Sequence, residues 1–133
     1  MFRLELPWPP SINHYWRSVP MGRHVRVLLS KGGRSYRDAV RQSFINSGLP
    51  MQKGALWIKM ILYCPDWRAR DQDNLGKAVF DSLVHAGAIG GDEFICSSIC
   101  EKRKSADGEG RVIVEITQLE NGVVVKPSGA WLN

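Results

Sequence analysis

Two carboxylates separated by one residue are the feature of this sequence best suited to chemistry. Asp71 and Asp73 lie in the polar stretch Arg68-Ala69-Arg70-Asp71-Gln72-Asp73-Asn74. In an extended segment both side chains point to the same side, where their like charges repel and raise each other's proton affinity. A bound divalent cation removes that penalty, and oxygen ligands are those that Mg²⁺ prefers. The pattern predicts a magnesium site just before a helix.

The same residues also have a purely structural interpretation. Asp73 or Asn74 can cap the following helix, with Asp71 favouring the positive end of its dipole. Lys77 stands four residues after Asp73 and four before Asp81, so these three can form an exposed ion-pair ladder. In the functional interpretation, Lys77 contacts phosphate or stabilises a leaving group. Because acidic caps are common, the spacing alone favours the structural interpretation.

The scaffold around these residues begins with four predicted strands. Residues 2–6 alternate between apolar and charged, the pattern of a half-buried strand. Residues 55–63 are apolar on both faces, which predicts a central strand. Residues 94–102 and 111–117 are predicted to pair as a hairpin around a turn at 106–110. The basic segment 17–26 is interpreted as a mobile loop. A further short strand is predicted at 25–29, where this segment ends.

Two helices complete the scaffold. The first is predicted at 36–47, with Ser35 as its N-cap and Gly48 as its stop, and the second at 74–86, ended by Gly87. The order of elements predicts an α+β fold, a two-layer sandwich with two main helices packed on a mixed, mostly antiparallel sheet. We assign residues 1–119 to this domain and expect 120–133 to be a mobile tail.

Composition narrows the class of partner. The 133 residues carry a formal net charge of +5, with a sequence pI near 9.4, which favours a polyanionic partner. No run of 18 apolar residues exists, so no membrane span is predicted, and the N-terminus lacks a signal-peptide pattern, so we expect a cytoplasmic location. The three cysteines form no zinc-ligand spacing, and we expect reduced thiols. No small-molecule cofactor is predicted.

An ordered set of residues is similar to the RusA family of Holliday-junction resolvases. The resemblance covers roughly residues 2–117. It is carried by Leu6-Pro7-Trp8-Pro9-Pro10-Ser11-Ile12-Asn13, by Tyr15-Trp16-Arg17, by Tyr36-Arg37-Asp38, by Arg70-Asp71-Gln72-Asp73-Asn74 with Lys77, Asp81, Leu83, Ala86 and Gly87, and by Asp92.

The resemblance implies a homodimeric nuclease that cuts four-way DNA junctions with paired, symmetric nicks, using Mg²⁺ or Mn²⁺. The family's three essential aspartates fall on Asp71, Asp73 and Asp92, which would hold the metal, and its essential lysine falls on Lys77. One departure concerns the pair of adjacent aspartates usual after the second helix, which here reads Gly91-Asp92. If the first of that pair were essential, this chain would be impaired, or Glu93 would have to substitute.

The position of Asp92 raises a problem of reach. A helix of about 13 residues carries the chain roughly 20 Å away from Asp73. The link from Gly87 to Asp92 returns at most about 17 Å when fully extended. Asp92 therefore reaches the site only if the link folds straight back along the helix, or if a partner subunit supplies it. The sequence leaves both routes open.

Basic and aromatic residues are candidates for the DNA surface. The group His14, Tyr15, Trp16 and Arg17, with Arg23, His24 and Arg26, could grip phosphates and stack on unpaired bases, although Trp16 could equally be a core aromatic. Beside the predicted metal site, Arg68, Arg70, Asn74 and Lys77 are further candidates, whereas Arg68 and Arg70 could also be a solvated cluster. Arg103 and Lys104 either extend the basic face or are merely solvated.

Three functions compete for this pattern. The resemblance favours the junction-cutting enzyme. A basic protein that binds branched DNA without cutting it remains open because of Gly91. A metal-dependent nuclease acting on flaps or RNA is the third.

Overall fold

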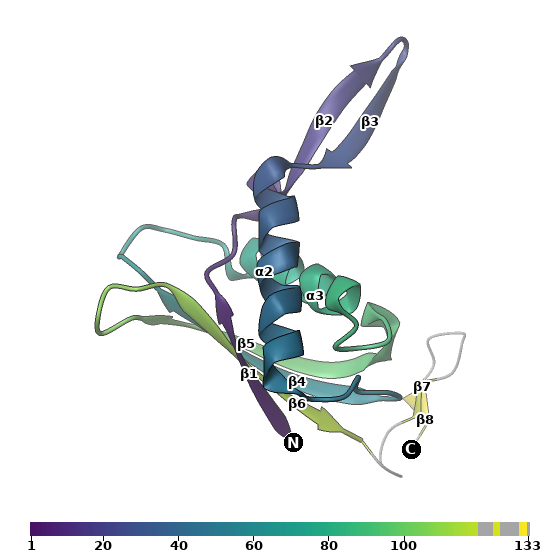
Figure 1. The fold of residues 1–133 in the computed structure, drawn as a ribbon, viewed down its shortest axis with the longest axis vertical. Coiled ribbons are helices and arrows are strands. Elements are labelled where there is room, and N and C mark those ends of the chain that lie inside the picture. Colours follow the sequence, from purple (N-terminus) through teal and green to yellow (C-terminus); the bar gives the residue numbers. More distant parts are fainter. Residues whose placement is uncertain (120–123, 126–130, 133) are drawn as a thin grey trace.

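The computed structural model describes residues 1–119, 124–125 and 131–132. A four-stranded sheet is formed by β1 (Phe2–Pro7), β4 (Leu56–Cys64), β5 (Ile95–Lys104) and β6 (Arg111–Gln118). The helices are α1 (Ile12–Tyr15), α2 (Lys31–Ser47) and α3 (Gln72–Ala86), and a 3-10 turn, η1, covers Asp92–Phe94. A separate hairpin consists of β2 (Trp16–Met21) and β3 (His24–Leu29) (Figure 1).

The sheet is mixed and has the order β1-β6-β4-β5. β6 pairs antiparallel with both β1 and β4, and β5 pairs parallel with β4. The predicted α+β sandwich is confirmed, and so is the central place of residues 55–63. The predicted hairpin of residues 94–102 and 111–117 is wrong, because β4 lies between β5 and β6. β4 has a strand paired along each edge, and local turn chemistry does not reveal which strands those are.

The core lies between the sheet and the two long helices. Alternate residues of β4 (Leu56, Ile58, Met60 and Leu62) are completely buried on the face that α2 and α3 cover. Val40 of α2 and Leu83 of α3 contribute from the helical layer. Both helices therefore bury an apolar stripe, as their 3.6-residue periodicity requires. The open ends of the helices and their connecting loops are left to carry the polar residues.

Helix α2 begins earlier than its sequence predicted. Its N-cap is Ser30, whose hydroxyl accepts a hydrogen bond from Gly33 N at 2.9 Å, rather than Ser35. The single proton of the same hydroxyl is shared between the carbonyl oxygens of His14 and Tyr15, which lie 2.6 Å and 2.9 Å away, so the cap also fixes α1. A Cβ on Gly33 would lie 2.3 Å from the carbonyl oxygen of Tyr15. This close approach requires a glycine at position 33. An argument from helix propensity counts glycine only as a weak helix former, so it does not predict the residue here.

The basic segment 17–26 is not a loop, and this prediction is wrong. It forms most of the β2–β3 hairpin, which extends beyond α2 and away from the sheet (Figure 1). Its two-residue turn is Gly22-Arg23, and Gly22 has a φ of +62°, which glycine adopts without strain. The short strand predicted at 25–29 is confirmed as part of β3.

The connection after α3 turns back along the helix. Gly87 ends the helix in the left-handed region with a φ of +81°, as predicted, and its N–H bonds to the last turn. Ala88 N donates to Leu83 O at 3.0 Å, and Ile89 forms an isolated bridge with Gln52. These bonds direct the link toward η1, beside α3, which is the course of the first of the two routes that the reach argument left open.

The C-terminal segment is described only in part. The tail predicted at 120–133 lies mostly outside the described residues, apart from the antiparallel pair β7 (Val124–Val125) and β8 (Trp131–Leu132). Among the described residues, no helix has the length and apolar character needed to cross a membrane.

Candidate functional site

The loop between β4 and α3 presents Asp71 at the start of the helix. Asp71 is the N-cap of α3, with extended backbone angles, and its Oδ1 accepts a hydrogen bond from Asp73 N at 3.0 Å. The structural role foreseen for Asp73 or Asn74 therefore belongs to Asp71. The side chain is exposed, and a carboxylate has about four lone-pair sites, so one N–H bond leaves it able to ligate a cation.

Asp73 lies in the first turn of α3 and faces solvent. Its side chain is 71% exposed, and its Oδ2 lies 3.3 Å from the Nζ of Lys77, one turn along the helix. The predicted ion-pair ladder is thus half formed: Lys77 pairs with Asp73, whereas Asp81 pairs with Arg37. Lys77 is 61% exposed, and an ion pair between two such side chains adds little to stability.

Asp92 lies in η1, on the same side of α3 as Lys77. Asp92, Lys77 and Asp81 line one open hollow of about 520 Å³, whose remaining lining is apolar: Trp16, Phe80 and Val84. Since Lys77 both lines this hollow and pairs with Asp73, it links the two carboxylate positions. The folded-back link after Gly87 accounts for this placement.

The three aspartates predicted to hold a metal do not form one closed cluster. Within the described part of the chain, no three His, Cys, Asp or Glu side chains converge as a metal-binding group. The donor chemistry nevertheless fits Mg²⁺, because Asp71, Asp73 and Asp92 are exposed carboxylates, and oxygen is its preferred ligand. Asp71 and Asp73 could hold such an ion at the helix start, whereas Asp92 lies in the hollow that Lys77 lines.

A second hollow lies at the start of α3. It measures about 450 Å³, and Asp71 and Asn74 form part of its wall. Its basic residues are Arg68, Arg70 and His14. Three of the predicted DNA-binding residues (Arg68, Arg70 and Asn74) therefore meet around Asp71, where cationic side chains could hold a phosphate against the carboxylates.

The two arginines before Asp71 differ in their freedom. Arg70 is only 17% exposed: its Nη1 lies 2.7 Å from Asp66 Oδ1, and its guanidinium lies 5.4 Å from the centre of the Trp8 ring. The Arg70 side chain, by its hydrogen bond, lowers the pKa of Asp66 to about 2, with help from the backbone N–H of Arg68. The Arg68 side chain is 82% exposed, and its Nε lies 3.8 Å from Asp66 Oδ2, a long surface contact that adds little to stability.

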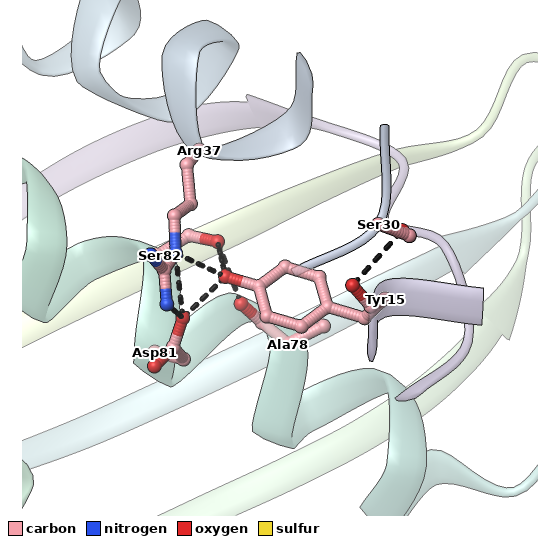
Figure 2. A network of polar contacts seen from close by, with 6 residues as sticks. All are labelled: Tyr15, Ser30, Arg37, Ala78, Asp81 and Ser82. Atoms are coloured by element: carbon pink, nitrogen blue, oxygen red, sulfur yellow. Dashed lines mark hydrogen bonds and ion pairs between the residues drawn. The ribbon is translucent and has the colours of Figure 1, made fainter. Parts of the chain in front are cut away.

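Tyr15 was predicted to contact DNA, and the structure contradicts this. The residue is completely buried, and its hydroxyl donates a short hydrogen bond to Asp81 (Figure 2). Arg37 Nε donates to that hydroxyl at 2.8 Å, and Arg37 Nη2 donates to Asp81 Oδ2 at 2.8 Å. Burial raises the pKa of Tyr15 above its ordinary range, and the bond to Asp81 adds to the shift. Tyr15 ties α1, α2 and α3 together.

Trp16 and the hairpin arginines keep exposed surface. Trp16 is half-buried, packs edge-on against Tyr15 with ring centres 5.3 Å apart, and lines the hollow that contains Lys77 and Asp92. Arg17, Arg23 and Arg26 are all exposed on the β2–β3 hairpin. The structure thus places these three arginines, unlike Trp16, outside the lining of the two hollows, on an element that projects from the domain (Figure 1).

The Gly91-Asp92 pair has an acidic neighbour that the structure places against it. A Cβ on Gly91 would lie 2.2 Å from the Oε2 of Glu93, so the Glu93 carboxylate occupies the space where a longer side chain at position 91 would begin. The φ of Gly91 is 171°, an extended value that any residue adopts. An aspartate at position 91 would therefore need only a rotation of the Glu93 side chain.

Two residues near the site were not predicted from the sequence. Trp67 is 85% exposed in the loop that carries Asp71, and Lys102 of β5 donates from its Nζ to the carbonyl oxygen of Arg70. A tryptophan in a polar loop four residues before Asp71 was the available signal. The nearness of Lys102 depends on the parallel pairing of β4 and β5, which the sequence did not reveal.

Comparison with known proteins connects this geometry to one family. The family model described as "Endodeoxyribonuclease RusA" matches residues 7–117. The chain is 37% identical over 121 residues to the crossover junction endodeoxyribonuclease rusA of Enterobacteria phage HK97, covering 90% of this chain and 97% of that protein. It is 37% identical over 122 residues to crossover junction endodeoxyribonuclease RusA of Escherichia coli strain K12, and 36% identical to that of Shigella sonnei, with the same coverage.

The matched range includes the residues that line both hollows and the four residues for which the resemblance implies catalytic roles: Asp71, Asp73, Lys77 and Asp92. With more than a third of positions identical along nearly the whole length of both proteins, the chain belongs to the RusA family of endodeoxyribonucleases.

Proposed function

We propose that this chain resolves four-way DNA junctions by paired, symmetric nicks, through Mg²⁺-dependent hydrolysis of phosphodiester bonds. One observation carries the proposal: in a chain of the RusA family, exposed carboxylates at the start of α3 stand beside a lysine that lines one hollow with Asp92. Asp71, Asp73 and Asp92 would hold the metal, and Mn²⁺ could replace Mg²⁺.

The bound ion would supply a Lewis acid that offsets phosphate charge and makes water a better nucleophile. The ammonium group of Lys77 would neutralise charge that develops on the scissile phosphate. Arg68, whose exposed guanidinium has only a 3.8 Å contact with Asp66, would grip the neighbouring phosphate, while Arg70, held by Asp66, fixes the loop that carries Asp71. Asn74, on the wall of the same hollow, would donate to the DNA backbone.

A homodimer completes this scheme. A four-way junction has approximate two-fold symmetry, and two nicks on strands of like polarity need two sites, whereas each chain offers one. A C₂ dimer would carry +10 charge, twice +5, which strengthens its hold on converging backbones. We place the subunit interface near α3 and the region between Gly87 and Asp92, where Phe94, two residues after Asp92, is 40% exposed. We expect this enzyme to act in the cytoplasm.

A synthetic four-way junction incubated with Mg²⁺, Ca²⁺ or EDTA tests the proposal. Symmetric nicks with Mg²⁺ alone are expected. Equal cutting of flaps or single strands would point to another nuclease instead. Sedimentation at low micromolar concentration tests the dimer: a stable monomer that still makes paired nicks contradicts it.

A second function is favoured by one observation, the glycine at position 91. Without the carboxylate usual there, the chain could bind branched DNA and leave it intact. Binding of the junction without nicks in Mg²⁺ would support this alternative. Glu93 separates the two further: if its carboxylate replaces the missing one, Glu93→Gln should slow cleavage, and Gly91→Asp should restore it.

A further inference from the structure

Trp67 presents an uncovered indole close to the candidate site. It is 85% exposed, the largest exposed fraction among the large apolar side chains of the described residues. Single exposed apolar residues are common and need no explanation by themselves. The position of this one is unusual, because it stands in the loop between β4 and α3, four residues before Asp71.

The backbone on both sides of Trp67 is held in place. Asp66 accepts a hydrogen bond from Arg68 N at 2.9 Å and pairs with the Arg70 guanidinium at 2.7 Å. At the start of the loop, the carbonyl oxygen of Cys64 accepts from Ser105 N at 2.8 Å. A side chain that is exposed on a fixed backbone loses little further freedom when a ligand covers it.

Cations surround the indole. Trp67 lines a shallow hollow of about 270 Å³ whose charged residues are four cations, Arg68, Lys102, Arg103 and Lys104, and one carboxylate, Asp66. The Nζ of Lys104 lies 6.0 Å from the centre of the indole ring. The parallel pairing of Cys64 with Lys104 brings the basic end of β5 to the edge where the loop begins. The basic residues of this hollow come from two elements that are distant in sequence.

The charge of this surface favours nucleic acid over protein as its occupant. Lysine is depleted at the centres of protein–protein interfaces, whereas grooves for unpaired nucleic acid combine cations with an aromatic side chain on which a base stacks. Within a duplex both faces of a base are covered by its neighbours. A base offers a free face where the helical stack is interrupted, as at the branch point of a junction.

We propose that Trp67 stacks on a base exposed at the branch point of the DNA junction, while Arg68 and Lys102 hold the adjoining phosphates. Trp67 is then a residue that selects the junction over linear duplex. This inference rests on the proposed function. It assigns the substrate contact to the loop that carries Asp71, so binding of the branch point and placement of a nearby phosphate at the carboxylates are coupled.

The test measures the binding of a synthetic four-way junction and of a linear duplex in Ca²⁺, with the wild-type chain, Trp67→Ala and Trp67→Phe. Ile45→Ala, on α2, is the matched control, because Ile45 is also an exposed apolar residue, with 56% exposure. We expect Trp67→Ala to weaken junction binding about 10-fold and duplex binding less than about twofold. Trp67→Phe should retain most of the affinity, and Ile45→Ala all of it.

Two further readouts separate stacking from charge. 2-Aminopurine at the branch point should change its fluorescence on binding of the wild type but not of Trp67→Ala, whereas the same probe within an arm should respond to neither. Trp67→Ala should leave the slope of log affinity against log salt unchanged, while Arg68→Ala should lower it by about 0.9.

The outcomes separate this inference from the function beneath it. A wild-type chain that cuts the junction, with a Trp67→Ala variant that binds junction and duplex as the wild type does, overturns the role of Trp67 alone. Equal weakening for junction and duplex overturns it too. A wild-type chain that neither binds nor cuts the junction defeats the proposed function and this inference together.

Discussion

Two carboxylates on the same helix have opposite surroundings. Asp73 and Asp81 stand eight residues apart on α3, about 12 Å along the axis. Asp81 accepts hydrogen bonds from Arg37 and Tyr15, and its side chain is 36% exposed. Asp73 is 71% exposed, and its contact is a 3.3 Å ion pair with Lys77. One carboxylate is engaged by the fold, and the other is open to a ligand.

The difference shows how one helix divides structure from chemistry. The charge of Asp81 is matched by a partly buried guanidinium and a buried hydroxyl, so its loss should affect folding. The negative charge of Asp73 is offset only by a solvated lysine, so its loss should affect whatever binds there. Both residues fit the spacing of the predicted ladder, and their surroundings in three dimensions separate them.

The largest expected effect is on cleavage by Asp73→Asn. The rate should fall by more than about 10³-fold, beyond the loss typical of a single preorganised donor, because the variant lacks a charged oxygen ligand. Junction binding should be unchanged or tighter, since the substitution removes a negative charge that repels phosphate. Single-turnover cleavage and gel-shift assays measure the two effects. Nicking at a near wild-type rate would remove Asp73 from the metal-binding set.

Lys77→Ala should have the next largest effect. If Lys77 stabilises charge in the transition state, the rate falls by about 10²–10³-fold. If it serves only the exposed pair with Asp73, the free energy of unfolding falls by a few tenths of a kcal/mol and the rate is unchanged. Single-turnover rates beside urea unfolding curves distinguish these cases. Lys53→Ala, another exposed lysine and distant in sequence, is the control.

Asp81→Ala should show the opposite of the pattern predicted for Asp73→Asn, with its main effect on stability. Removing this carboxylate leaves Arg37 and the buried Tyr15 hydroxyl without their shared acceptor, and we expect a loss of about 1–3 kcal/mol in the free energy of unfolding, discounted for partial exposure. Urea unfolding at fixed protein concentration measures it. Asp38→Ala, at an exposed position of α2, should change stability by less than about 0.5 kcal/mol. Equal stability of the two variants would refute the contrast.

Much of the fold followed from patterns that are local. Alternation and two-sided apolarity located β1 and β4, and glycine located the ends of α2 and α3. The pairing of β5 with β4 depends on contacts distant in sequence, and no turn residue records it. The start of α2 was missed because Gly32 and Gly33 are weak helix formers, whereas close packing against Tyr15 requires a glycine at position 33.

The candidate site was predicted unevenly for a similar reason. Spacing marked residues close in sequence, Asp71, Asp73 and Lys77, as candidates, the family resemblance added Asp92, and their roles in metal binding and catalysis stay predictions. Tyr15 was misjudged because an aromatic residue beside basic ones looks alike in the sequence whether its ring is buried or exposed. Its burial depends on Arg37 and Asp81, which come from two other helices. Trp67 was missed because no periodicity marks an exposed position within a loop.

The smallest expected effect concerns the β2–β3 hairpin. Its two faces differ as Asp73 and Asp81 do, because one face offers charge to a ligand and the other does not. Arg17 and Arg26 share one face by the strand register, because Arg17 pairs with Leu28 and Arg26 with Val19. The opposite face carries Val25 and Val27, which are 68% and 59% exposed. If the basic face lies along the DNA backbone, each arginine adds about 0.9 to the slope of log affinity against log salt, without sequence preference.

The variant that replaces Arg17 and Arg26 by alanine should therefore lower that slope by about 1.8, while the relative affinities for different junction sequences stay the same. Replacing Val25 and Val27 by serine is the matched control, since it alters the same strands without changing charge. Its slope should equal that of the wild type. Fluorescence anisotropy at several salt concentrations gives both slopes. An unchanged slope in the double-arginine variant would place the hairpin away from the DNA. If the valine variant instead binds less tightly, and the loss of affinity becomes smaller as protein concentration rises, the apolar face of the hairpin belongs to the dimer interface.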